Sequence, residues 1–224
     1  LIGDSTVTRT YAIGDIHGCR AKLLALVEFC RVDAGEQRAK FIFLGDYIDR
    51  GPDSKGVIDY LMALRQEQPK DVVCLMGNHE DMLLTALDAE DWEERWLRNG
   101  GIQTLQSYGA SHARDIPSHH VAWLRSLPRF HDDGLCFFVH AGIHPDRPLD
   151  QQDEHDLLWI RERFLSSTKD FGRLIVHGHT PLKTGKPDIR PNRLNLDTAA
   201  VYGGPLTAAV FDNSSTGPES FLFL

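Results

Sequence analysis

The chain has 224 residues, of which 42% are hydrophobic and 25% are charged. This composition is close to the average of globular proteins and excludes disorder and fibrous repeats. No apolar run reaches the roughly 18 residues of a membrane span, and the N-terminus lacks the basic-then-apolar pattern of a signal peptide. A net charge of −8 argues against nucleic acid as a partner, because proteins that bind it usually carry a basic face.

We predict one domain over residues 1–224, since about 150 residues per domain do not require a second one. The chain begins at Leu1 rather than Met, which is typical of a trimmed product or a fragment. Its four cysteines form no C-x-x-C pair, so we expect reduced, structural thiols and a cytoplasmic location. We expect no membrane partner. These cysteines are Cys19, Cys30, Cys74 and Cys136.

The first half alternates strand-like and helical patterns. Apolar runs at 7–13, 41–44 and 72–76 predict strands. After each run, apolar residues at helical spacing predict a helix, and these residues begin at Leu23, Val57 and Met82, respectively. This alternation predicts an α/β layer with a parallel sheet.

The second half changes character. Residues 90–131 are expected to form a mostly helical insertion. Short strands are predicted at 135–139, 174–176, 193–196, 206–211 and 221–224. We expect these strands to form a second, more antiparallel sheet that packs on the first.

Five predicted strands end in turns that carry metal-competent side chains. The turns are GDIHG (14–18), GDYIDRG (45–51), GNHE (77–80), HAG (140–142) and HGHT (177–180). In α/β folds the carboxyl ends of parallel strands form the crevice where ligands bind, so these side chains are expected to converge.

Six of these side chains are candidate metal ligands. Asp15 and His17 stand two residues apart and face the same way in an extended segment. The two oxygens of Asp46 can bridge two cations. Because six ligands exceed one ordinary site, we predict two divalent cations that share Asp46. The candidates are Asp15, His17, Asp46, Asn78, His140 and His179. Oxygen and imidazole donors without thiolate favour Mn, Fe, Zn or Co.

The charge of such a centre suits a phosphate group. Two divalent cations outweigh the two aspartates, and Arg50 and Arg161 are candidates to clamp phosphate oxygens. A cation pair lowers the pKa of a bridging water and stabilises an in-line displacement. His79 is the candidate general acid, and Asp49 could hold its ring and raise its pKa.

Simpler interpretations compete at several positions. Residues 52–54 are a turn and a helix N-cap, and Arg161 could be an ordinary surface arginine. Asp197 and Tyr202 could line the pocket or belong to a turn. His177 is expected to support a ligand rather than to bind metal. The remaining histidines are expected at the surface or at caps: His112, His119, His120, His131, His144 and His155.

The five blocks together resemble the phosphoprotein phosphatase branch of the calcineurin-like metallophosphoesterases, in particular small bacterial and phage serine/threonine protein phosphatases. The resemblance covers about residues 11–211 and implies an αββα sandwich with a dinuclear centre at strand-end loops. It implies that one cation is held by Asp15, His17 and Asp46, and the other by Asp46, Asn78, His140 and His179. It also implies that His79 and Asp49 form the acid pair and that Arg50 and Arg161 bind phosphate.

The expected activity is hydrolysis of phosphomonoesters, foremost protein phosphoserine and phosphothreonine, by in-line attack of a metal-bridging hydroxide. Manganese is the first choice of metal. The alternative is a symmetrical bis(5′-nucleosyl)-tetraphosphatase, whose relatives usually lack an aspartate at position 49 and have Asp at the position of Glu80. Partners would then be a phosphorylated protein or peptide, or a small nucleotide phosphoester. A non-catalytic scaffold on the same fold is a second alternative.

Overall fold

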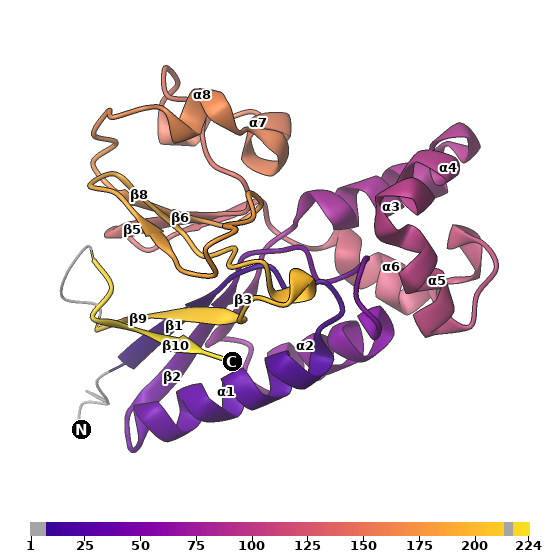
Figure 1. Ribbon diagram of the computed structural model, residues 1–224, viewed down its shortest axis with the longest axis horizontal. Coiled ribbons are helices and arrows are strands. Elements are labelled where there is room, and N and C mark those ends of the chain that lie inside the picture. The colour runs from indigo at the N-terminus through magenta and orange to yellow at the C-terminus, as the bar shows by residue number, and fades with distance from the viewer. Residues whose placement is uncertain (1–7, 213–216) are drawn as a thin grey trace.

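Two five-stranded sheets pack face to face in the computed structural model, which describes residues 8–212 and 217–224. The first sheet has the order β10 (Ser220–Phe223), β9 (Thr207–Phe211), β1 (Thr8–Ile13), β2 (Arg38–Phe43), β3 (Val72–Cys74). The second has the order β4 (Phe130–Asp132), β5 (Cys136–Val139), β6 (Leu174–His177), β8 (Arg193–Asn195), β7 (Asp188–Ile189). This is the predicted two-sheet α/β sandwich (Figure 1).

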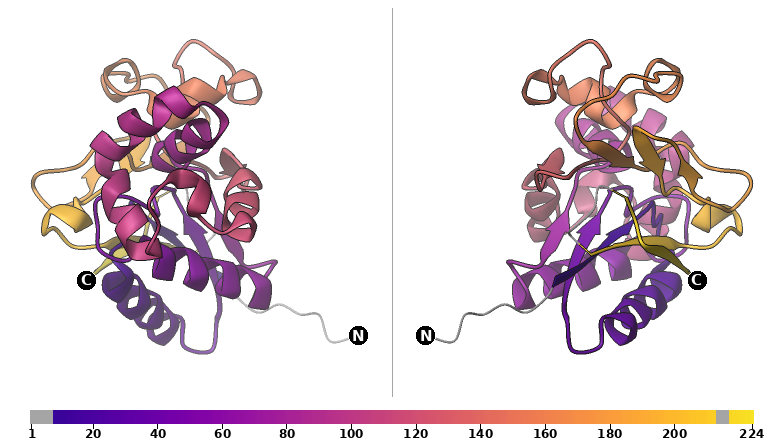
Figure 2. Two further views of the ribbon diagram at one scale, coloured as in Figure 1. Left: turned by 90° about the vertical axis from the view of Figure 1, so that its right-hand side faces the viewer. Right: turned by 90° about the vertical axis from the view of Figure 1, so that its left-hand side faces the viewer.

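Helices cover the outer faces of both sheets. The first sheet rests on α1 (Arg20–Ala34) and α2 (Ser54–Glu67), and the second is covered by α7 (Glu154–Trp159) and α8 (Glu162–Leu165) (Figure 1). Four further helices stand beside the sheets, as Figure 2 shows from two sides. They are α3 (Asn78–Asp88), α4 (Glu93–Trp96), α5 (Ile102–Tyr108) and α6 (Ser118–Arg125). Short turns of helix at Glu90–Trp92, Leu97–Gly101 and Ala113–Asp115 connect them.

The strands of the first sheet are buried on both faces. In β2, Phe41 and Phe43 pack with the α1 and α2 side of the core, whereas Ile42 packs with the second sheet. Between the sheets, Phe138 of β5 meets Phe211 of β9 edge to face, with ring centroids 6.0 Å apart. Burial on both faces explains why these strands are continuous apolar runs in the sequence.

Two predictions about the sheets are wrong. The segments 206–211 and 221–224 do not join the second sheet, because β9 pairs antiparallel with β1 and β10 with β9. The second sheet is also no more antiparallel than the first: each contains two parallel and two antiparallel pairs among the described residues. An apolar run fixes a buried strand but not the neighbour with which it pairs. Val7, predicted as strand, lies outside the described residues.

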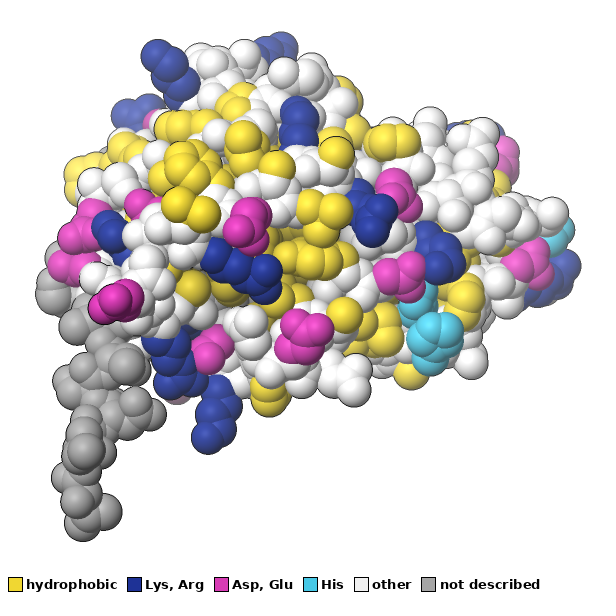
Figure 3. Space-filling view, turned by 90° about the horizontal axis from the view of Figure 1, so that it is seen from below, with side chains coloured by type: hydrophobic (Ala, Val, Ile, Leu, Met, Phe, Trp, Pro, Cys, Tyr) yellow, Lys and Arg dark blue, Asp and Glu magenta, His cyan; other side chains and the backbone are white. Residues whose placement is uncertain are grey.

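The outer face over α1 and α2 mixes acidic and basic side chains (Figure 3). Ion pairs along these helices include Arg31 with Glu28 and Lys55 with Asp59. In the part of the chain that the structure describes, no helix has the length and apolar character needed to cross a membrane.

Phe138→Ala tests the packing between the sheets. Phe138 is fully buried, so we expect a loss of about 3–5 kcal/mol in the free energy of unfolding, measured by denaturant titration. The matched control is Phe29→Ala on α1, where the side chain is 42% exposed and the expected change is within about 0.5 kcal/mol. Equal losses in both variants would contradict this description of the core.

Candidate metal centre

The parallel strands deliver the candidate ligands to one place. Asp15 and His17 follow β1, Asp46 follows β2, and Asn78 begins α3 after β3. His140 and His179 follow β5 and β6 of the other sheet. All six side chains are buried, and the centre lies where the carboxyl ends of strands from both sheets meet.

Asp46 is the residue that two groups of ligands share. Ligand atoms of His17, Asp46 and His79 lie within 4.8 Å of one another, and so do those of Asp46, His140 and His179. One carboxylate oxygen of Asp46 is 3.4 Å from His17 Nε2, and the other is 3.4 Å from His140 Nε2. The two oxygens therefore face different histidines, as a bridging carboxylate requires.

Asn78 belongs with the second group. Its side-chain oxygen lies 2.8 Å from His140 Nε2 and 2.7 Å from His179 Nδ1. A neutral carbonyl oxygen between two imidazole nitrogens is a donor set that divalent transition metals accept.

Asp15 lies beside the centre but outside both groups of described residues. Its two oxygens accept the backbone N–H of His179 at 3.1 Å. Burial, then the nearby charges of Asp197 and Asp46, raise the pKa of Asp15 well above its ordinary value. Burial also raises the pKa of Asp197 to about 6. Three crowded, buried carboxylates are what bound cations would neutralise, so the residues present fit a cation pair.

The histidines are in the state that metal binding needs. Burial lowers the pKa of His17 to about 3 and that of His179 to about 2, so both rings are neutral near pH 7. Nδ1 of His17 lies 2.8 Å from the carbonyl of Ile48, and Nδ1 of His140 lies 2.8 Å from that of Leu44. A carbonyl partner assigns the proton to Nδ1, which leaves the Nε2 lone pair facing the centre.

Strained backbone is concentrated in these turns. Six described residues other than glycine have positive φ, and five of them are candidate site residues: His17, Asp46, Asp49, Arg50 and His179. Residues other than glycine rarely adopt a positive φ, so the surrounding contacts must hold the backbone in this conformation.

Glu80 supplies much of that support, a role that could not be predicted from the GNHE motif alone. Its carboxylate accepts backbone N–H groups from Gly77, Asp46, Tyr47 and Ile48 at 2.8–3.2 Å. These bonds fix the turn after β2 against the start of α3. Glu80, which lies outside both candidate ligand groups of the described residues, thereby positions the Asp46 carboxylate.

His79 and Asp49 form a buried pair. His79 Nδ1 lies 2.7 Å from the Asp49 carboxylate, and His79 Nε2 lies 4.0 Å from Asp46. Asp49 also accepts bonds from Trp96 Nε1 at 3.0 Å and from Thr104 Oγ1 at 2.6 Å. The carboxylate therefore fixes the ring with Nε2 toward the centre, where it can either donate a proton or bind a cation.

Two arginines border the centre. Arg50 Nη1 is 2.7 Å from His17 Nε2, and Arg161 Nε donates to His179 Nε2 at 3.0 Å. Arg161 is exposed, but its guanidinium contacts a candidate ligand. Both guanidinium groups are placed to meet an anion at the centre.

Three histidines outside the candidate ligand set and the acid pair are also buried. His177 is buried against Phe164 with ring centroids 5.1 Å apart and lies outside both ligand groups of described residues. His120 was expected at the surface or at a cap but is 2% exposed, because its ring contacts Tyr108 and Asp59 in the α2–α6 packing. His144 is buried as well.

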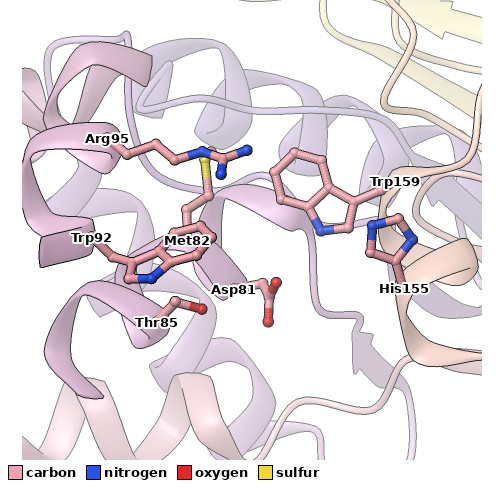
Figure 4. A pocket seen from close by; sticks show the side chains of 7 residues that line it. All are labelled: Asp81, Met82, Thr85, Trp92, Arg95, His155 and Trp159. Carbon is pink, nitrogen blue, oxygen red and sulfur yellow. The ribbon is translucent and has the colours of Figure 1, made fainter. Parts of the chain in front are cut away.

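An aromatic groove of about 320 Å³ adjoins the centre. Figure 4 shows Trp92 and Arg95 on one side of it and Trp159 and His155 on the other. The Trp159 ring meets His179 edge to face with centroids 6.2 Å apart, so this groove opens beside the candidate ligands.

Comparison with known proteins agrees with this geometry. The family model for calcineurin-like phosphoesterases matches residues 8–209. The serine/threonine-protein phosphatase 1 of Salmonella typhimurium is 34% identical, over 89% of this chain and 90% of its own. An asymmetrical bis(5′-nucleosyl)-tetraphosphatase PrpE of Anoxybacillus flavithermus is 28% identical, over 91% of both chains. The crystal structure of a putative diadenosine tetraphosphatase superposes with a TM-score of 0.67 at 26% identity, over 99% of this chain and 94% of that one.

The fold, the paired His and Asp groups and the family match lead to one conclusion. Such centres use two metal ions to hydrolyse phosphoesters. The chain belongs to the calcineurin-like phosphoesterase family and is a metal-dependent phosphatase.

Proposed function

We propose that the protein removes phosphate from phosphoserine and phosphothreonine in proteins. The observation that carries this proposal is the buried His79–Asp49 pair beside the bridging Asp46. The serine/threonine phosphatase relative, matched over nearly the whole length of both chains, supports the same substrate class.

His79 would act on the leaving group. The serine or threonine oxygen leaves as an alkoxide and needs a proton, which His79 Nε2 would donate. Asp49 holds Nδ1 and so orients Nε2 toward the centre, and Trp96 and Thr104 in turn hold Asp49. Arg50 and Arg161 would orient the phosphate oxygens.

The ligands support two cations, for which we propose manganese first and Fe, Zn or Co as alternatives. Asp15, His17 and Asp46 would hold one, and Asp46, Asn78, His140 and His179 the other. Bound there, the cations would supply positive charge to the phosphate and an activated water. The donor set contains no thiolate, which supports these metals over a structural zinc site.

Hydrolysis of a dinucleoside tetraphosphate is the second candidate, because bis(5′-nucleosyl)-tetraphosphatases are also among the relatives. A panel of a phosphoserine peptide, a phosphothreonine peptide and diadenosine tetraphosphate, each with Mn²⁺, separates the two. We expect the higher kcat/KM for a phosphopeptide. A higher kcat/KM for the dinucleotide would overturn the proposal.

We also propose a cytoplasmic location. The four cysteines are all free thiols, and three of them are buried. This pattern is typical of proteins from reducing compartments.

Asp46→Asn tests the shared ligand. The amide cannot bridge two cations as a carboxylate does, so we expect the metal content to fall from about two ions per chain to well below one. Elemental analysis of the purified protein measures this. Asp88→Asn, on the exposed part of α3, is the matched control and should keep both ions. Retention of both ions by Asp46→Asn would contradict the bridging role.

His79→Asn tests the acid role. We expect metal content to stay near that of the wild type and kcat to fall by about 10²–10⁴-fold on a phosphoserine peptide, but much less on para-nitrophenyl phosphate, whose leaving group needs little protonation. His112→Asn, at the surface, is the control. Equal losses on both substrates would contradict a general acid, and loss of metal would identify His79 as a ligand.

A further inference from the structure

A second and larger groove lies beside two turns that adjoin the metal centre in the sequence. It measures about 790 Å³ and lies between residues 181–186, which follow β6, and residues 198–205, which precede β9. Pro181 stands two residues after the candidate ligand His179. Thr198 follows Asp197, a buried carboxylate whose charge acts on Asp15. Both walls of the groove are therefore continuous in the chain with residues of the centre.

The walls of the groove are fixed by hydrogen bonds. Lys22 Nζ donates to the carbonyls of Ala200 and Gly204 at 2.8 and 2.5 Å. The backbone N–H of Leu182 donates to the Asp197 carbonyl at 2.9 Å, which ties one wall to the other. The groove is thus formed before any ligand arrives, which lowers the entropic cost of binding.

One wall of the groove carries positive charge. Lys183 and Lys186 are exposed on one wall, and among the described residues neither ammonium group forms an ion pair. Most lysines and arginines on the α1 and α2 face, by contrast, alternate with acidic residues, as Lys55 does with Asp59. Two unpaired lysines in a groove of a protein with net charge −8 favour an anionic ligand.

Tyr202 connects the groove to the centre. Its side chain is 64% exposed, and the Arg50 guanidinium lies 5.9 Å from its ring centroid. The same guanidinium contacts His17. Arg50 and Tyr202 therefore link the centre to the groove. Cationic groups occur on both sides of this link, Arg50 at the centre and the two lysines in the groove.

We propose that this groove binds acidic residues next to the phosphorylated residue of a peptide substrate, through Lys183 and Lys186. This proposal rests on the proposed function. The volume, more than twice that of the aromatic groove, leaves room for several residues of an extended peptide. The aromatic groove is a weaker candidate for anions, because the guanidinium of Arg95 is already stacked on Trp92 at 4.7 Å.

The test compares two phosphoserine peptides that differ only in flanking residues, which are Asp and Glu in one and Asn and Gln in the other. The readout is the ratio of their kcat/KM values with Mn²⁺, so that any change in basal activity cancels. We expect the wild type to prefer the acidic peptide about threefold to tenfold, less so in high salt, and the double variant Lys183→Ala/Lys186→Ala to lose the preference. The control Arg31→Ala/Lys70→Ala removes the same charge elsewhere and should keep it.

Each outcome has one meaning. The groove assignment is overturned if the wild type shows no preference or if the lysine variant keeps the full preference. In either case, turnover of both peptides still supports the phosphatase proposal. Turnover of neither peptide overturns the proposed function itself. If the lysine variant loses activity on diadenosine tetraphosphate but shows the wild-type peptide ratio, the groove binds a polyphosphate and the acidic-peptide assignment is wrong.

Discussion

The position of the Asp46 carboxylate is the constraint on which the rest of the centre depends. A buried carboxylate is costly unless cations or hydrogen bonds surround it. Here its two oxygens face histidines delivered by different sheets, His17 from the first and His140 from the second. The strained turn that presents it is held by four backbone N–H groups donating to Glu80. The geometry of the centre therefore depends on how the two sheets pack, because the candidate ligands come from both sheets.

The sequence predicted the parts of this arrangement that are local. Each strand-end turn carries its own ligands, so their convergence followed from the rule that parallel strands end at one edge. The support for Asp49 could not be predicted in the same way, since Trp96 and Thr104 lie 47 and 55 residues away in a helical segment without a recognisable pattern. Pairing of β9 with β1 was missed for a similar reason: the apolar run shows burial, and only the three-dimensional register shows the partner.

We assign phosphate chemistry to the centre and recognition of the rest of the substrate to the grooves around it. In the function proposed above, the cation ligands and His79 would act on the phosphate group itself. Two grooves have a lining residue that contacts a side chain of the centre: Trp159 of the aromatic groove contacts His179, and Tyr202 of the basic groove contacts Arg50. Residues in these grooves can change without disturbing the ligands, because they lie in loops and helices outside the strand ends. Relatives that act on proteins and on dinucleotides are both compatible with such a division.

The most direct test of the central claim is a crystal structure of the manganese-loaded protein with anomalous difference maps at the manganese edge. We expect two anomalous peaks, one on each side of the Asp46 carboxylate, with one beside His17 and the other beside His140 and His179. A single peak, or peaks located away from Asp46, would contradict it.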